Sequence, residues 1–205
     1  MNVNVKDVYE IIANDFDDTR KSQWVWIEEF LNQFPKKSLE SSLESFLIYD
    51  IGCGSGRNIR EGMIGVDNCH KFIEICEAKD LNVILGNMCD LPLESNSGIG
   101  LICIAVFHHL KTVELRLKTL NEFKRVLVKG SRLMISVWSI NQGDHKKLKF
   151  IYGDNLVPWT KHGETHQRYY YIFKNEEILE LFEKVGLKLI SHQWNHGNEI
   201  FILET

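Results

Sequence analysis

The residues best suited to chemistry lie in the segment Ile48-Tyr49-Asp50-Ile51-Gly52-Cys53-Gly54-Ser55-Gly56. An apolar run ends beside an acid, and three glycines then alternate with small residues. Glycine lets a backbone turn sharply and approach a ligand without a Cβ atom in the way. This pattern is typical of a parallel strand that ends at a nucleotide-sized ligand. Asp50, Gly52 and Gly54 are therefore candidate ligand-binding residues.

The spacing of these glycines narrows the class of ligand. The run G-x-G-x-G does not match the pyrophosphate-binding spacing G-x-G-x-x-G at its third glycine. A phosphate loop of the form G-x-x-x-x-G-K-[ST] is also absent from the sequence. We therefore expect a ligand that lacks phosphates.

A second acid follows at the end of the short run Ile64-Gly65-Val66-Asp67. A carboxylate at the tip of a second buried strand suits a ribose, because it accepts hydrogen bonds from both hydroxyls. The alternative role for Asp67 is to cap the helix that follows, since Asp and Asn favour that position. The two roles are compatible, and the sequence leaves both open.

Composition sets limits on the class of protein. A chain of 205 residues with 44% hydrophobic residues fits a single domain, here residues 1–205. Its net charge of −4 does not indicate general affinity for nucleic acid. Five cysteines without a C-x-x-C pair indicate reduced thiols in a cytoplasmic or nuclear protein. We expect no metal site, no signal peptide and no membrane span.

Periodicity predicts alternating strands and helices. Helices are expected over 4–14, 22–34, 70–79, 112–128 and 175–185, and strands over 47–51, 63–66, 83–85, 100–106, 132–138, 187–194 and 199–204. The last two strands form a hairpin around His196-Gly197-Asn198. Residues 1–35 are expected to cover part of the active site, and the polar segment 139–168 is a candidate substrate loop. The order of elements predicts a three-layer α/β sandwich.

Ligands of such sheets bind beyond the carboxyl ends of the strands. Asp50, Asp67, Asn87 and Ala105 all fall at or just after those ends of predicted strands. We therefore expect these four residues to lie around one site.

Several segments together resemble the eukaryotic tRNA methyltransferases that esterify 5-carboxymethyluridine at the wobble position. The resemblance extends over nearly the whole chain. It rests on Tyr9-Glu10-Ile11-Ile12-Ala13 with Thr19-Arg20, on the glycine loop, on Ala105-Val106-Phe107-His108-His109-Leu110, on Val157-Pro158-Trp159 and on Arg168-Tyr169-Tyr170-Tyr171. The glycine loop is common to many methyltransferases, whereas the Thr-Arg, Val-Pro-Trp and Arg-Tyr-Tyr elements are more selective.

The resemblance implies a Rossmann-like class I fold with a mostly parallel seven-stranded sheet and an antiparallel C-terminal hairpin. It implies S-adenosylmethionine as cofactor, tRNA as substrate and a heterodimer with a small zinc-binding activator protein. The implied residues are Asp50, Gly52, Gly54, Asp67, Asn87, Met88 and Ala105 for the cofactor, Arg20, His109, Arg168 and Tyr169 for catalysis, and Tyr9, His108, Trp138 and Trp159 for the substrate. Lys146 and Lys147, with Lys149, form the densest basic cluster, and the sequence leaves open whether it contacts phosphates of the substrate or is a solvated loop. We expect the activator to pair with the edge strand Val83-Ile84-Leu85.

The chain departs from that family pattern in three places. Asn87 stands where relatives often have an acid that accepts from the adenine amino group, Leu110 replaces a tryptophan, and only residues 160–167 separate Val-Pro-Trp from Arg-Tyr-Tyr. Two other functions therefore stay open at this point. One is a methyltransferase of the same fold for a small carboxylic acid or other metabolite, and the other is a non-catalytic binding subunit.

Overall fold

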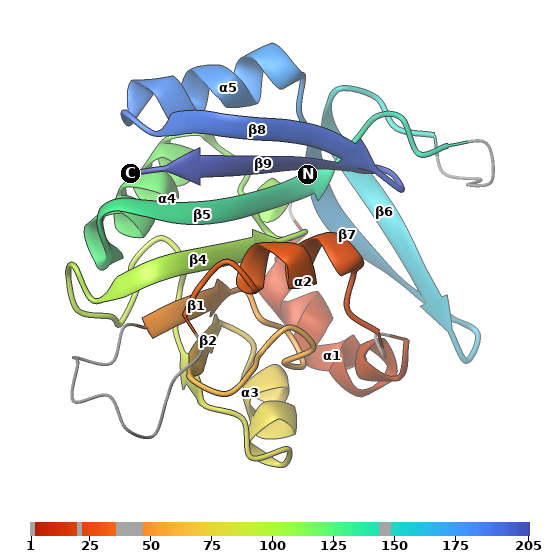
Figure 1. Ribbon diagram of the computed structural model, residues 1–205. Helices are drawn as coiled ribbons and strands as arrows, with labels where there is room; N and C mark the ends of the chain where they lie inside the picture. Colours follow the sequence, from red (N-terminus) through yellow and green to blue (C-terminus); the bar gives the residue numbers. More distant parts are fainter. Residues whose placement is uncertain (1–2, 20–21, 36–46, 144–148) are drawn as a thin grey trace.

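The computed structural model describes residues 3–19, 22–35, 47–143 and 149–205. Seven strands of this part form one sheet in the order β3-β2-β1-β4-β5-β9-β8 (Figure 1). Their bounds are β1 (Leu47–Ile51), β2 (Met63–Asp67), β3 (Val83–Leu85), β4 (Gly98–Ile104), β5 (Leu127–Trp138), β8 (Lys188–Asn195) and β9 (Asn198–Glu204). Strands β1 to β5 are parallel, and β9 pairs antiparallel with both β5 and β8. The predicted sheet with its C-terminal hairpin is confirmed.

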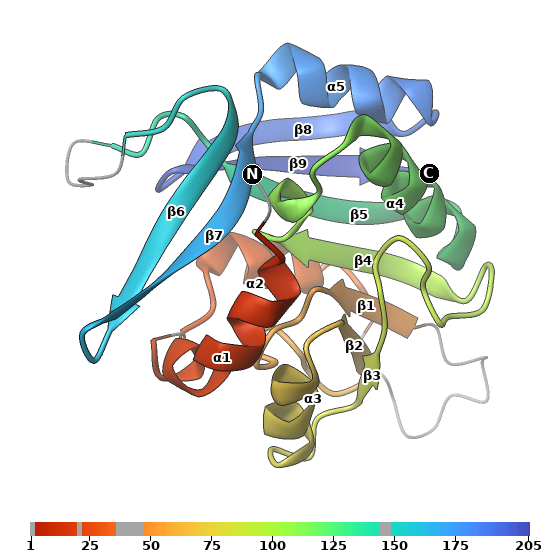
Figure 2. The ribbon, with the colours of Figure 1, turned by 180° about the vertical axis from the view of Figure 1, so that it is seen from behind.

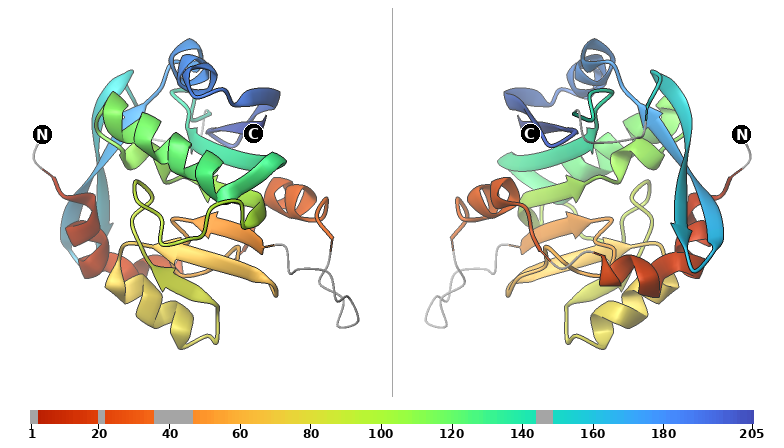
Figure 3. Two further views of the ribbon diagram at one scale, coloured as in Figure 1. Left: turned by 90° about the vertical axis from the view of Figure 1, so that its left-hand side faces the viewer. Right: turned by 90° about the vertical axis from the view of Figure 1, so that its right-hand side faces the viewer.

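Helices cover both faces of the sheet. They are α1 (Val5–Asp18), α2 (Val25–Leu31), α3 (His70–Glu77), α4 (Val113–Val126) and α5 (Asn175–Lys184). Figure 3 shows the sheet edge-on, with α2 on one side and α3 and α4 on the other. None of the described helices is long and apolar enough to cross a membrane.

The central strand β4 is buried on both faces, as its continuous apolar run predicts. Successive side chains of a strand point to opposite faces. Leu101 and Cys103 accordingly pack in the core beneath α4 and α5, whereas Ile102 and Ile104 pack with α2. This two-sided burial holds the carboxyl end of β4 in place.

One predicted boundary and one predicted loop are wrong. Residues 127 and 128 belong to β5 rather than to the preceding helix, because that strand already begins at Leu127. Most of the predicted loop over 139–168 is a β-hairpin made of β6 (Gly153–Lys161) and β7 (Glu164–Ile172). In Figures 1 and 2 this hairpin lies beside the main sheet and extends away from it.

The turn of the β6–β7 hairpin is a His-Gly pair, a local signal for a hairpin within the predicted loop. His162 and Gly163 connect the strands with φ angles of +52° and +83°. Two consecutive positive φ angles are what a two-residue hairpin turn of type I′ requires. The second His-Gly pair, His196 and Gly197, makes the same kind of turn between β8 and β9. The polar residues of β6 hide its alternation in the sequence.

Arg116 of α4 joins the end of the hairpin to the rest of the domain. Its side chain is buried, donates to the carbonyl oxygens of Leu110 and Lys111, and lies 3.6 Å from the centre of the Tyr171 ring. Glu177 of α5 lies 3.6 Å from the guanidinium and accepts a hydrogen bond from Tyr171. Arg116 thereby holds together α4, α5, β7 and the segment that follows β4.

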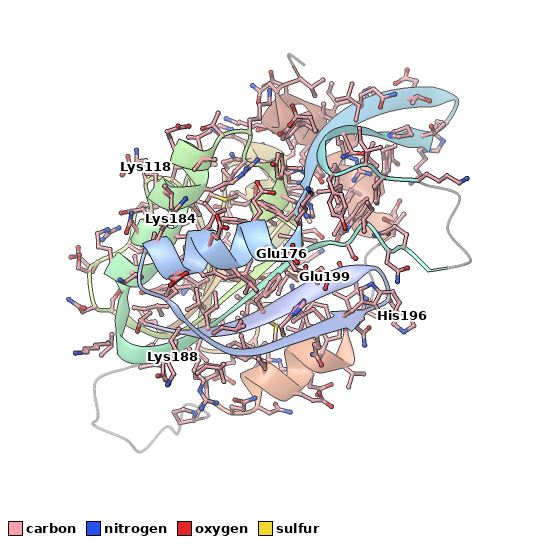
Figure 4. The ribbon with its side chains drawn as sticks, turned by 90° about the horizontal axis from the view of Figure 1, so that it is seen from above. Lys118, Glu176, Lys184, Lys188, His196 and Glu199 are labelled. Atoms are coloured by element: carbon pink, nitrogen blue, oxygen red, sulfur yellow. The ribbon has the colours of Figure 1, made fainter. Side chains whose placement is uncertain are left out.

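We expect Arg116→Ala to lower the free energy of unfolding by about 2–4 kcal/mol, because it leaves two buried carbonyl groups without donors and Glu177 without its cation. Urea denaturation measures this loss. Lys118 is the matched control, since it is an exposed cation on the outer side of the same helix (Figure 4). Lys118→Ala should change stability by less than about 0.5 kcal/mol. Equal effects of the two substitutions would contradict the role of Arg116.

Candidate active site

A cavity of about 780 Å³ lies at the carboxyl ends of β1, β2 and β4 and beside the segment after β3. Residues from the described N-terminal ranges 3–19 and 22–24 form part of its wall. The predicted site residues that line it are Tyr9, Gly52, Gly54, Asp67, Asn87, Met88, Ala105, His109 and Trp138. The sheet therefore brings together residues that lie far apart in the sequence.

The glycine loop and Asp67 form one hydrogen-bonded unit. Asp67 Oδ2 accepts from the Gly54 N–H at 2.8 Å, and Oδ1 accepts from the Cys69 N–H at 2.9 Å. The cap of α3 is Cys69, so Asp67 stabilises the turn before this helix instead of capping it directly. Each carboxylate oxygen can accept more than one hydrogen bond. Asp67 therefore still has lone pairs for ligand hydroxyls in the cavity.

Two glycines of this loop are required for different reasons. Gly52 has a φ of +74°, and a Cβ atom there would lie 2.5 Å from a methyl group of Val106. Gly54 has a φ of +54°, but a Cβ atom there would meet nothing within 4 Å. Gly52 therefore serves close packing of the loop against the end of β4, whereas Gly54 borders open space in which a ligand fits.

Asp50 lies directly behind this loop and does not line the cavity itself. Its side chain is buried, and neither carboxylate oxygen has a hydrogen-bond partner among the described residues. Burial, with a smaller contribution from the charge of Asp67, raises the pKa of Asp50 to about 7. A buried carboxyl group without donors is costly in a folded protein. It suits a ligand that supplies N–H or O–H groups.

The loops after β3 and β4 provide the opposite part of the wall. Ala105 has a φ of +56°, which is unusual for a residue with a Cβ atom, and its N–H donates to both the carbonyl and the hydroxyl of Ser136. Asn87 Oδ1 accepts from the Cys89 N–H at 2.9 Å. The oxygen expected to replace the acid of the family thus already has a donor, although its second lone pair remains.

His109 links three elements of the site. Its Nδ1 lies 2.7 Å from the carbonyl oxygen of Tyr169, and its Nε2 lies 3.2 Å from the hydroxyl of Tyr9. A carbonyl oxygen only accepts, so Nδ1 carries the proton and Nε2 accepts from Tyr9. Burial lowers the pKa of His109 to about 4, and the imidazole is neutral at pH 7. His109 therefore orients Tyr9 and β7 around the cavity.

His108 does not line the cavity. Burial lowers its pKa, and its Nδ1 accepts from the Trp138 N–H at 3.1 Å. The neutral ring therefore has its proton on Nε2, which finds no partner among the described residues. His108 packs at 4.5 Å against the ring of Tyr170, which itself stacks on Trp138 at 4.4 Å. These rings support the aromatic end of the cavity.

The hairpin places two predicted catalytic residues, Arg168 and Tyr169, on opposite faces, because they are neighbours on β7. Tyr169 is buried and donates to Asp154, whereas Tyr170 lines the cavity on the same face as Arg168. Tyr170, which is not among the predicted site residues, is thus the cavity residue, and strand alternation is the signal that identifies it.

Arg168 lies beside this aromatic end. It is 4% exposed, and its guanidinium carbon lies 5.3 Å from the Tyr170 ring centre. Within the described residues its Nε–H has no acceptor, and no carboxylate forms an ion pair with it. A buried cation without a counter-ion is costly, so an anionic group is expected to approach it.

The remaining predicted site residues either do not line the cavity or lie outside the described residues. Trp159 lies on β6 outside the cavity lining, and Arg20, Lys146 and Lys147 lie outside the described residues. Trp24 and Arg57, with His196 and Asn198 near the β8–β9 turn, line the cavity without having been expected. Among the described residues, no group of three or more His, Cys, Asp or Glu side chains is arranged to hold a metal ion.

Comparison with known proteins gives consistent matches. Residues 49–135 match the family described as "Methyltransferase domain". Over 230 aligned residues the chain is 30% identical to the tRNA (carboxymethyluridine(34)-5-O)-methyltransferase of Schizosaccharomyces pombe, covering 99% of this chain and 96% of that protein. It is 33% identical to the tRNA (carboxymethyluridine(34)-5-O)-methyltransferase ALKBH8 of Mus musculus, over 75% of this chain and only 23% of that protein.

Solved structures show the same fold at lower identity. A putative methyltransferase in complex with the Haloferax volcanii Trm112 methyltransferase activator aligns with a TM-score of 0.70 and 17% identity, covering 98% of this chain and 97% of that one. A SAM-dependent methyltransferase from Methanosarcina mazei aligns with a TM-score of 0.65 and 17% identity, covering 90% of this chain and 98% of that one.

The titration of Asp50 leads to a testable dependence of stability on pH. Its folded pKa of about 7 lies above the ~3.9 of an unfolded chain. The stability that this group contributes is therefore fully present below about pH 4 and is lost as the pH rises to about 7. Asp50→Asn cannot ionise, so the variant should gain up to ~4 kcal/mol relative to the wild type between about pH 4 and about pH 8.

Urea unfolding of both proteins at several pH values measures this difference. Only its change with pH is informative, because the uncharged amide is also buried without partners at every pH. Asp7→Asn on the exposed side of α1 is the matched control and should show no such change. Parallel stability curves for Asp50→Asn and the wild type would contradict the assignment.

Proposed function

The chain belongs to the tRNA (carboxymethyluridine(34)-5-O)-methyltransferase family, and we propose that it methylates the carboxylate of 5-carboxymethyluridine at the wobble position of tRNA. The product is the methyl ester. The observation that carries this proposal is the near end-to-end match to the fission-yeast enzyme, whose length the chain spans almost completely. The cavity beyond the parallel strands is where the fold places such chemistry.

The residues of the cavity fit S-adenosylmethionine, which supplies a methyl group bound to a positively charged sulfur. Asp50 has two buried oxygens without donors, which suits the ammonium group of the amino-acid end. The open space at Gly54 admits a ligand against the backbone, and Asp67 retains lone pairs for ribose hydroxyls. Asn87 and Met88 are the residues for the adenine end.

The reaction needs little acid–base help from the protein. A carboxylic acid has a pKa near 4, so the substrate carboxylate is ionised at pH 7 and is already a nucleophile. His109 is neutral and has both ring nitrogens engaged, which fits a positioning role and not that of a general base. The protein's tasks are to remove water from the carboxylate and to aim it.

Arg168 is the proposed holder of the substrate carboxylate. It is the buried cation beside the aromatic end of the cavity, and a guanidinium binds a carboxylate through two parallel hydrogen bonds. Arg20 is proposed as a second cation on the grounds of the family motif alone. Trp138 and Tyr170 form the aromatic wall against which a uracil ring can lie.

The first experiment uses labelled S-adenosylmethionine and tRNA that carries 5-carboxymethyluridine, with and without an activator protein. We expect a methyl ester that is released by mild base. Arg168→Met should lower the transfer rate by about 10²-fold or more, since the carboxylate loses its positioning cation, while calorimetric affinity for S-adenosylmethionine stays within about twofold.

Arg132→Met is the matched control, because Arg132 contacts Gln33 on the outside of β5, away from the cavity. This variant should retain full activity. Cofactor binding without transfer to the tRNA, together with transfer to a small carboxylic acid, would contradict the RNA substrate and favour a metabolite methyltransferase.

The activator is proposed to pair with β3. This strand forms one edge of the sheet, and Leu85 is 45% exposed. Gly65 donates to Asn82, and Gly86 donates to Asp67, so the even-numbered residues of this segment face β2. In a parallel pair the alternate residues point the other way, which leaves the N–H groups of Val83 and Leu85 on the open edge.

Val83→Pro should therefore weaken capture of the activator by at least about tenfold, because it removes one outward N–H donor without removing a bond to β2. Val83→Thr is the matched control, since it keeps both the branched shape and the N–H. Pull-down with purified activator and circular dichroism of the free variants measure binding and folding separately. Unchanged capture by a folded Val83→Pro chain would exclude this edge.

A further inference from the structure

One face of the β6–β7 hairpin carries a file of cationic and aromatic side chains that begins at the cavity. Tyr170 lines the cavity, and Arg168 and His166 follow on the same face of β7. Trp159 pairs with His166 across the hairpin, and Lys161 lies beyond it at the turn. We call these five residues the hairpin track. One acid shares this face, because Glu164 pairs in register with Lys161 and its carboxylate lies 3.5 Å from Nε2 of His166. At about 3.3 Å per strand residue, the track extends roughly 20 Å from the cavity to the turn.

Acidic residues of α1 hold the outer end of the hairpin track. Lys161 Nζ lies 2.7 Å from Asp15 Oδ1 and 3.2 Å from Asp18 Oδ2. His162, the next residue in the turn, lies 3.4 Å from the same oxygen of Asp15. The hydrogen bond from Lys161 keeps the pKa of Asp15 below its usual range. The outermost cation of the hairpin track is thus already paired within the protein.

The contacts between the end of α1 and the hairpin turn are ion pairs, whereas Tyr9, Ala13 and Phe16 pack against Phe72 of α3. Only Ile12 and Ala13 of this helix are buried, and Ile11 is 64% exposed. On its other side, Glu10 accepts from the first N–H groups of α3, and Asp17 pairs with Lys79 at 2.8 Å. Exposed ion pairs contribute little stability. The ion pairs between α1 and the hairpin turn can therefore open at low cost while α1 stays packed on α3.

We propose that the hairpin track is a binding surface for the RNA backbone, and that Asp15 and Asp18 occupy Lys161 in the free protein in place of RNA phosphates. The inference rests on the proposed function, because it assigns the surface that receives the nucleotides next to the modified uridine. When RNA binds, its phosphates replace the carboxylates of Asp15 and Asp18 at Lys161. The end of α1 is then released from the hairpin.

The arrangement matches the chemistry of single-stranded RNA. Such strands bind to surfaces that combine cations for phosphates with aromatic rings for bases. The hairpin track offers Lys161 for a phosphate and the ring of Trp159 for a base, while Arg168 at its inner end holds the substrate carboxylate. The track leads directly to the cavity wall at Tyr170. Phe16 and Thr19, which alternate with the acids along α1, also line the cavity. Release of α1 at this end therefore opens the cavity at the place where the flanking nucleotides enter.

The test compares Asp15→Asn with Asp17→Asn in the full chain. Both substitutions remove one negative charge from the end of α1, but only Asp15 pairs with Lys161. We expect Asp15→Asn to bind an anticodon stem-loop RNA with 5-carboxymethyluridine about two- to fivefold more tightly than the wild type, because exposed pairs are worth this much. Asp17→Asn should differ from the wild type by less than about 1.5-fold. Fluorescence anisotropy at several salt concentrations measures both.

Lys161→Ala provides an opposing measurement. It should weaken binding of the same RNA and reduce the salt slope by about one, since one phosphate contact is lost. Adding Asp15→Asn to Lys161→Ala should give no further gain. Equal gains in Asp15→Asn and Asp17→Asn, or an unchanged salt slope in Lys161→Ala, would overturn the proposal while leaving the proposed function intact. A wild-type chain that binds S-adenosylmethionine but not the RNA would overturn both.

Discussion

The site depends on the common edge at which four parallel strands end. Asp50 of β1 is in register with Gly65 of β2 and Ile102 of β4, so the segments that follow these strands emerge side by side. The hydrogen bond from Gly54 to Asp67 then ties the loop after β1 to the end of β2. Because β1 lies between β2 and β4, its glycine loop occupies the centre of the cavity wall.

Several residues at this edge are arranged for a ligand at the expense of stability. Asp50 is buried without donors, and Ala105 has a backbone conformation that favours glycine. Arg168 is a buried cation without a counter-ion among the described residues. Elsewhere the core is conventional, with apolar side chains from both faces of β4 packed under helices. The unpaired groups therefore gather around the cavity, where a ligand with complementary groups would satisfy them.

The cover of the cavity differs in kind from its base. The base consists of strands buried on both faces, whereas α1 and the hairpin are joined mainly by ion pairs and by the Tyr9–His109–Tyr169 contacts. Strong packing keeps the loop after β1 and the end of β4 in a fixed geometry. Polar contacts allow the cover to exchange its partners for those of a charged substrate. This division suits an enzyme that must enclose a cofactor and also admit a large polyanion.

The sequence by itself determined the succession of strands and helices along the chain, the glycine loop and the acids at the ends of β1 and β2, because these depend on local periodicity and turn chemistry. It also identified His109 as a residue of the site. Its aromatic run Tyr169-Tyr170-Tyr171 did not reveal which ring faces the cavity, since the β6–β7 hairpin was hidden by its polar residues. Only the strand, once formed, assigned alternate residues to opposite faces.

The tertiary structure alone decided the contacts between distant segments. The protonated nitrogen of His109 is set by a carbonyl group 60 residues away. The raised pKa of Asp50 follows from burial and from Asp67 on the next strand. The pairing of Lys161 with Asp15 joins the first helix to a hairpin near the end of the chain. Burial, register and electrostatic pairing of this kind arise when the chain folds, and no local pattern in the sequence encodes them.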